Sequence, residues 1–274
     1  MEEGMLVDYH IHTYLCGHAE GEPLEYVREA ERKGVSEIGF SDHIMVDKWR
    51  PEYAMKITQV EEYVKLVETV EKQSSIPIKL GAEIDYFPGR EGEIGRIMEE
   101  FPFDYTIGSV HFLGDWVIDD PRYVDEYYRR DINEVYIQYF SIVEKMVSSG
   151  LFDIVGHLDI VKKFGFKPTI DITPIVSRIL RKIKVNGLCV EINTAGLEKP
   201  AKEVYPSEWI LRMCKEMEIP ATLGSDSHKP WEVGRHFNVA LDLMRKVGYR
   251  QIATFSRRKL ELKGLNFQSS SARS

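Results

Sequence analysis

The stretch Met5-Leu6-Val7-Asp8-Tyr9-His10-Ile11-His12 decides the fold, because a short apolar run ends there in two histidines separated by one residue. Side chains two positions apart on a β-strand point to the same face. We therefore expect His10 and His12 to converge at the C-terminal end of a strand, as ligands of one metal ion must. Buried histidines satisfied by hydrogen bonds have the same spacing, so this pair alone leaves both interpretations open.

The same arrangement, an apolar segment that ends in His, Asp or Glu, recurs along the chain. The further segments are residues 37–43, 78–85, 105–111, 153–157, 188–193 and 221–228. Apolar residues at helical spacing lie between them, most clearly over residues 56–73, and a last helix is expected from about Trp231 to Val247. Seven strands that alternate with helices predict βαβ units and a parallel sheet.

The positions of the candidate ligands favour a closed barrel over an open sheet. An open, doubly wound sheet gathers its ligand at one switch point, with one or two strands. Here nearly every predicted strand ends in a candidate ligand, which is typical of a barrel whose active site draws on many strand ends. The chain also has no GxGxxG or Walker sequence. No linker divides the sequence, so one α/β barrel domain is predicted.

Composition and charge exclude several classes of protein. The formal net charge of −8 disfavours a nucleic-acid partner, which normally requires a basic face. No apolar run approaches the ~20 residues that cross a bilayer, and the acidic start is unlike a signal peptide, so a cytoplasmic protein without membrane contact is expected. Cys16, Cys189 and Cys214 lack CxxC spacing, which argues against a disulfide scaffold.

Seven of the eight histidines belong to the set of predicted strand-end and loop ligands. The set comprises His10, His12, His18, His43, Glu83, His111, His157, Asp226 and His228. Nitrogen and carboxylate donors suit zinc, manganese or iron, and these donors are too many for one ion. A shared carboxylate such as Glu83 could bridge two ions. Two or three metals roughly 3.5–4 Å apart are a recurring solution for the hydrolysis of phosphate esters.

These motifs resemble the PHP (polymerase and histidinol phosphatase) superfamily of metal-dependent phosphoesterases, over nearly the whole chain to about Phe255. The residues that carry the resemblance are Asp8-Tyr9-His10-Ile11-His12-Thr13, Ser41-Asp42-His43, Gly81-Ala82-Glu83, Ser109-Val110-His111, Gly156-His157 and Ser225-Asp226-Ser227-His228. The resemblance implies a distorted, TIM-like (β/α)7 barrel with a trinuclear centre. We expect this domain to span residues 1–266, with residues 267–274 as a disordered tail.

The resemblance also implies a role for each ligand. His10, His12, Glu83 and Asp226 would hold a first metal; Glu83, His111 and His157 a second; His18, His43 and His228 a third. A hydroxide between the first two metals would be the nucleophile. Asp226 or His228 would then protonate the leaving alkoxide as a general acid.

Within the superfamily, residues 191–200 and 205–207 and the stretch Cys16-Gly17-His18-Ala19 resemble the histidinol-phosphatase branch. That branch usually has a basic residue where this chain has Glu198. The resemblance implies a phosphomonoesterase that converts L-histidinol phosphate to L-histidinol in histidine biosynthesis. Two alternatives stay open: a phosphoesterase that acts on nucleotides or short oligonucleotides, and a non-catalytic, metal-stabilised module.

The substrate is expected to be a small phosphorylated molecule. The sequence indicates the residues that contact it less clearly than it indicates the metal ligands. A phosphate dianion favours Arg or Lys beyond the metals. The candidates are Arg235 and Lys229 after the seventh strand, Lys162 and Lys163 after the fifth, and Asn193 at the end of the sixth. The sequence leaves open whether the protein is a monomer or a homo-oligomer.

Overall fold

The computed structural model describes residues 4–265, which form a nearly closed parallel barrel. The barrel strands, in spatial order, are β1 (Val7–Ile11), β2 (Glu37–Phe40), β4 (Ile78–Asp85), β5 (Tyr105–Ser109), β8 (Ile154–Val155), β9 (Cys189–Asn193) and β10 (Ala221–Gly224). Ser227, just after β10, closes the ring. Its carbonyl accepts from the His12 N–H over 2.9 Å, and its N–H donates to His10 O over 3.0 Å. The predicted seven-stranded barrel is thus confirmed.

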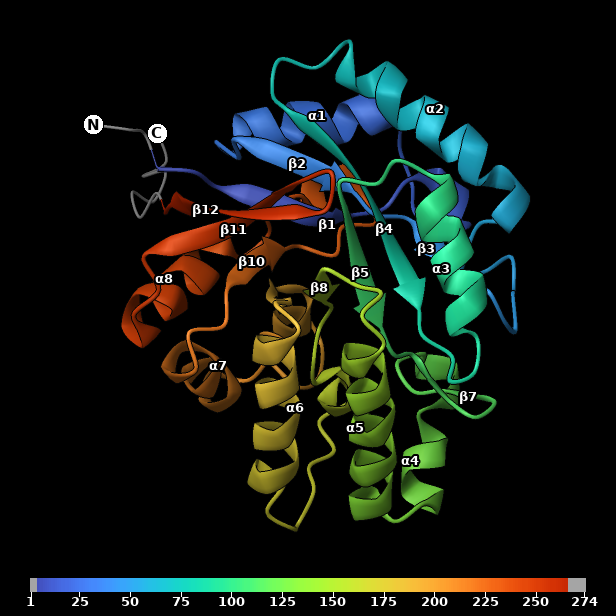
Figure 1. The fold of residues 1–274 in the computed structure, drawn as a ribbon, viewed down its shortest axis with the longest axis vertical. Coiled ribbons are helices and arrows are strands. Elements are labelled where there is room, and N and C mark those ends of the chain that lie inside the picture. Colours follow the sequence, from blue (N-terminus) through green and yellow to red (C-terminus); the bar gives the residue numbers. More distant parts are fainter. Residues whose placement is uncertain (1–3, 266–274) are drawn as a thin grey trace.

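Helices surround the strands in the described residues (Figure 1). They are α1 (Pro23–Arg32), α2 (Val60–Glu71), α3 (Glu91–Glu100), α4 (Asp125–Arg129), α5 (Ile132–Ser148), α6 (Thr173–Val185), α7 (Glu208–Glu216) and α8 (Phe237–Val247). Short strand β3 (His43–Ile44) pairs with β4, and a hairpin of β6 (Phe112–Leu113) and β7 (Trp116–Val117) follows β5. Each helix buries one apolar face, as in α2, where Val60, Val64 and Val67 face the core.

The last helix begins later than the sequence predicts, at Phe237 rather than near Trp231. Gly234 and His236, which precede this helix, have φ angles of 61° and 56°, and a right-handed helix cannot contain such angles. The Gly234 N–H donates to Asp8 Oδ2 over 2.9 Å, so a contact with β1 decides the local conformation. The helical spacing of the side chains could not reveal that contact.

A second hairpin closes the end of the barrel at which the strands begin. It consists of β11 (Gln251–Ser256) and β12 (Lys259–Gly264) and lies beside β1 in Figure 1. Its turn residue Arg258 pairs with Asp153, just before β8, over 2.9 Å. Phe255 packs against the rings of Tyr9 and Tyr105 inside the barrel. Side chains therefore fill this end, and any site must lie at the opposite, C-terminal end of the strands.

The domain boundary at residue 266 stays a prediction, and the tail predicted at 267–274 lies outside the described residues. Among residues 4–265, no helix combines the length and the apolar character that crossing a bilayer requires.

The barrel interior has room for one large ring because two neighbouring strands carry glycine. A Cβ atom on Gly39 would lie 2.1 Å from the Tyr105 hydroxyl oxygen, and one on Gly81 would lie 2.2 Å from the ring of the same tyrosine. Tyr105 is fully buried, and its hydroxyl donates to Tyr9 O over 2.7 Å. The ring therefore has no free space into which it could move.

We predict that Gly81→Ala destabilises the protein by about 1–3 kcal/mol or more, because the added methyl overpacks a closed interior. Gly92→Ala is the matched control, since Gly92 lies in α3 with open space around its Cβ position. That change should be neutral or stabilising by up to about 1 kcal/mol, as expected of alanine in a helix. Urea unfolding of both variants tests this, and equal stability of the two would contradict it.

Candidate metal centre

The carboxylate of Glu83, at the C-terminal end of β4, lies at the centre of the site and is fully buried. Its Oε2 is 3.0 Å from His10 Nε2 and 3.0 Å from His43 Nδ1. Its Oε1 is 2.9 Å from His157 Nε2. One carboxylate therefore meets three imidazoles, from β1, from β3 and from the segment after β8.

The remaining predicted ligands surround this carboxylate. His12 Nε2 is 3.6 Å from Glu83 Oε2 and 3.5 Å from Asp226 Oδ1. His111 Nε2 is 3.2 Å from the Nε2 of His157. The rings of His18 and His228 stack at a centroid distance of 4.4 Å, and the ring of His228 stacks on that of His12 at 4.1 Å. The structure thus brings all nine predicted ligands together.

Strand geometry and one unusual turn produce this convergence. His10 and His12 lie on the same face at the end of β1, as their spacing predicts. Asp226 has a φ of 54°, a left-handed conformation that aspartate tolerates better than most residues. This turn directs its carboxylate toward both histidines, and His10 Nε2 lies 3.9 Å from Asp226 Oδ1.

Unpartnered nitrogen atoms indicate that the cluster fits metal ions. Both ring nitrogens of His12, Nδ1 of His157 and Nε2 of His228 are buried without a hydrogen-bond partner. A buried polar atom without a partner is costly, and a cation would satisfy such lone pairs. The donor atoms of His10, His12 and Glu83 all lie within 4.8 Å of one another, as do those of His12, His43 and His228. The residues therefore fit a centre with nitrogen and oxygen ligands.

The pKa directions divide the predicted ligands into two groups. His12, His18 and His228 have lowered pKa values, as metal binding requires of a histidine. Burial would also lower the pKa of His10, His43 and His111, but nearby carboxylates outweigh it and raise all three. Burial lowers the pKa of His12 to about 3 and that of His18 to about 4, so both imidazoles are neutral at pH 7. Burial would raise the pKa of Glu83, but His43 and His10 outweigh it and hold this pKa well below its ordinary value. Burial also raises the pKa of the Cys16 thiol, so nitrogen and oxygen donors dominate the site.

Three carboxylates lie beneath the ligands, and the sequence alone did not assign them this position. Glu191 Oε1 lies 2.6 Å from His10 Nδ1, and Asp85 Oδ1 lies 2.7 Å from His111 Nδ1. Asp42 Oδ1 lies 3.8 Å from His12 Nδ1. Glu191 and Asp85 are within hydrogen-bonding distance of the outer nitrogen of a ligand histidine, and a carboxylate in that position fixes the tautomer and orientation of the ring. Asp42 is too far from His12 to form such a bond. The available signal was an acidic residue within an otherwise apolar strand.

Three of the side chains predicted to contact substrate do not line the cavity at the metal centre, so their contact with substrate stays a prediction. Lys162 is buried elsewhere, with its Nζ 2.9 Å from Asp159 Oδ2. Lys229 lies at the surface and pairs with Glu20 over 3.1 Å. Asn193 is fully buried, and its amide is hydrogen-bonded within the protein. A strand-end position alone did not reveal which way each side chain turns.

Arg235 does line this cavity, and two lysines join it. Arg235 donates to the carbonyls of Ser225 and Asp226, and its Nη1 is 3.2 Å from Glu198. Glu198 therefore forms a salt bridge in the loop. Lys163, which follows the fifth predicted strand together with Lys162, lines the same cavity, and so does Lys199.

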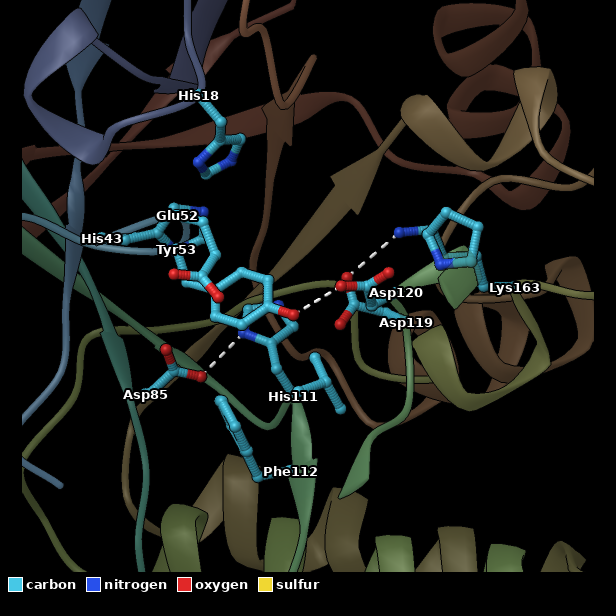
Figure 2. Close-up of a pocket in the computed structure, with 12 residues that line it drawn as sticks. His18, His43, Glu52, Tyr53, Asp85, His111, Phe112, Asp119, Asp120 and Lys163 are labelled. Carbon is cyan, nitrogen blue, oxygen red and sulfur yellow. Dashed lines mark hydrogen bonds and ion pairs between the residues drawn. The ribbon is translucent and has the colours of Figure 1, made fainter. Parts of the chain in front are cut away.

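Two adjoining cavities open at this end of the barrel. The metal cavity, of about 280 Å³, is lined by seven of the nine predicted ligands, all but His10 and His12, together with Lys163, Lys199 and Arg235. The side cavity, of about 270 Å³, shares His18, His43, His111, Asp119 and Lys163 with it. The side cavity adds Glu52, Tyr53, Asp85, Phe112 and Asp120 (Figure 2). The site thus has a basic part next to the metals and a part rich in carboxylates and aromatic rings.

Comparison with known proteins agrees with this geometry. The PHP domain model matches residues 8–195, and the PHP-associated model matches residues 210–243. A probable histidinol-phosphatase of Deinococcus radiodurans is 41% identical over 93% of this chain and 98% of the relative. The histidinol-phosphatase of Bacillus subtilis is 31% identical over 86% of this chain and 98% of the relative.

One solved structure is also similar to this chain. It is the histidinol phosphate phosphatase of Lactococcus lactis in complex with zinc, L-histidinol and phosphate. It has a TM-score of 0.78 and 26% sequence identity, over 93% of this chain and 98% of that one.

Fold, site and relatives together define the class of a metal-dependent phosphoesterase built on a parallel barrel. The chain belongs to the PHP domain family, on the histidinol-phosphatase branch.

We predict that removal of metal destabilises the folded protein. An ion that binds only the folded state adds about 4 kcal/mol at a thousandfold excess over its Kd, and one kcal/mol shifts the Tm of a chain of this size by roughly 2–4 °C. Chelator-treated protein should therefore melt roughly 10 °C or more below protein reloaded with zinc. Calorimetry with elemental analysis tests this, and a Tm independent of metal content would contradict it.

Proposed function

We propose that this protein is a histidinol-phosphatase that hydrolyses L-histidinol phosphate to L-histidinol and phosphate in histidine biosynthesis. The observation that carries the proposal is the pairing of a histidine and carboxylate centre with an acidic, aromatic cavity beside it. A phosphate ester that also carries an ammonium group and an imidazole matches both parts. The relatives named above support the same activity.

The proposed centre holds three divalent ions of zinc, manganese or iron, in the ligand sets expected from the sequence. Glu83 lies between the first two sets, because its two oxygens face different histidines. When bound, such ions hold phosphoryl oxygens and lower the pKa of water. Cytoplasmic localisation stays a prediction, and the state of oligomerisation stays open.

Cationic side chains of the metal cavity would bind the phosphate. Lys163 and Lys199 line this cavity, and each offers an ammonium group to the dianion. Partial burial and the charge of Lys163 lower the pKa of Lys199, so a bound anion would be stabilising there. Asp226 or His228, which line the same cavity, would deliver the proton that the leaving alkoxide needs.

The side cavity would hold the remainder of the substrate. Of its carboxylates, Asp85 pairs with His111, Asp119 with Lys163 over 3.0 Å, and Asp120 with Arg122 over 2.6 Å. Glu52 also lines this cavity, and no partner of its carboxylate is found among the described residues. Figure 2 shows Glu52 and Asp119 on opposite sides of the cavity. Glu52 is therefore the carboxylate most available to the substrate ammonium.

We predict that the enzyme loaded with zinc or manganese releases phosphate from L-histidinol phosphate at least roughly a hundredfold faster than from sugar or nucleotide phosphates, because only the former fills both cavities. A phosphate-release assay at equal substrate concentrations measures this. Short oligonucleotides should stay intact. Equal rates on all phosphates, or cleavage of oligonucleotides, would contradict the assignment.

We predict that Glu52→Gln lowers kcat/KM for L-histidinol phosphate roughly ten- to hundredfold, which is the value of one charge-assisted hydrogen bond. The control is the analogue of the substrate in which hydrogen replaces the amino group. Wild type and variant should hydrolyse this analogue at equal rates, because the lost interaction needs the ammonium. An equal loss on both substrates would show that Glu52 does not contact the ammonium.

A further inference from the structure

Glu191, on β9, is a buried carboxylate that the proposed reaction does not use. Its side chain is about 1% exposed, so solvent does not stabilise its charge. Its Oε1 lies 2.6 Å from His10 Nδ1, and its Oε2 accepts a hydrogen bond from the backbone N–H of His157 over 2.8 Å. Asn193 Nδ2 contributes a longer contact of 3.3 Å to Oε1. Each oxygen is therefore engaged with a different histidine.

These two histidines belong to different proposed metal positions, His10 to the first and His157 to the second. On their other side, the Nε2 atoms of both face Glu83, at 3.0 and 2.9 Å. Two carboxylates therefore span the same pair of histidines. Glu83 spans them on the cavity side, and Glu191 spans them on the side of the barrel wall.

The neighbouring strand leaves room for this arrangement. Gly224 at the end of β10 pairs with Asn193 in the sheet. A Cβ atom on Gly224 would lie 2.0 Å from Glu191 Oε1 and 2.7 Å from His10 Cβ. Any side chain at this position would therefore displace the carboxylate or the imidazole.

We propose that Glu191 is a positioning residue that couples the first two metal positions, an inference that rests on the proposed metal centre. Glu191 Oε1 faces Nδ1 of His10 at 2.6 Å as a hydrogen-bond acceptor, which places the imidazole proton on Nδ1 and leaves the Nε2 lone pair for the cavity. His157 has a φ of 22°, and the bond from its N–H to Glu191 holds this uncommon backbone conformation in place. One side chain thus orients a ligand of each metal.

Asp85 provides the natural comparison. Its Oδ1 lies 2.7 Å from His111 Nδ1, and His111 belongs to the second metal position alone. If orientation through a carboxylate sets metal affinity, Asp85→Asn should weaken one ion, whereas Glu191→Gln should weaken two. The glutamine is matched in size, but its amide has one carbonyl for two N–H donors.

Asp159→Asn is the control for the loss of a buried carboxylate. Asp159 is 3% exposed and accepts bonds from the Ser207 backbone N–H over 3.0 Å and from its hydroxyl over 2.7 Å, and it contacts none of the proposed ligands. This change should lower the Tm without any change in metal affinity.

The test measures zinc affinity and stoichiometry of the full-length protein by competition with a chromophoric chelator, well below every Tm. We expect Glu191→Gln to weaken two of three ions ten- to hundredfold, Asp85→Asn to weaken one, and Asp159→Asn to weaken none. Wild-type zinc affinity in Glu191→Gln, or a loss of affinity confined to one ion, would overturn the proposed coupling but not the proposed metal centre. A wild type that binds no zinc would overturn both.

Discussion

The structure depends on one shared carboxylate, that of Glu83, held out of water among imidazoles from several strands. An isolated buried charge is costly, so Glu83 can lie there only with polar partners or metal ions around it. Imidazoles from β1, β3 and the segment after β8 supply that environment at 2.9–3.0 Å. Such a group can exist only if the strands that carry it meet at one end of a closed ring.

Buried carboxylates beneath the C-terminal ends of the strands hold the ligand-bearing segments in place. Asp8 accepts hydrogen bonds from the N–H groups of Ser225 and Gly234, each over 2.9 Å, and so attaches the loop after β10 to β1. Asp42 likewise accepts from the backbone and hydroxyl of Thr13, and burial raises its pKa to about 7. These polar contacts occupy positions at which a protein without a site would place apolar side chains. The rigidity of the ligands depends on them.

The division of the site into two cavities explains how one barrel could combine general phosphoester chemistry with selectivity. In the proposed function, metals and lysines would bind the phosphate of any substrate, so they would not discriminate between substrates. Selectivity has to come from the side cavity, whose walls Phe112, Asp119 and Asp120 come from the long polar and aromatic segment after β5. In the proposed function, this connection would supply part of the surface that recognises the substrate, whereas the strand ends supply the metal ligands.

The sequence by itself predicted the barrel and the nine candidate ligands. Strand periodicity and a position at a strand end are local properties, so each segment can be interpreted without the others. The tertiary structure decided what depends on contacts between distant segments. It showed that Lys163 and Lys199 face the metal cavity and that Lys162 does not. It also showed that α8 begins only at Phe237, because Gly234 contacts Asp8. It also revealed Glu191, which in sequence is one acid in an apolar strand. Its role exists only because His10 and His157, far apart in the chain, lie on either side of its carboxylate.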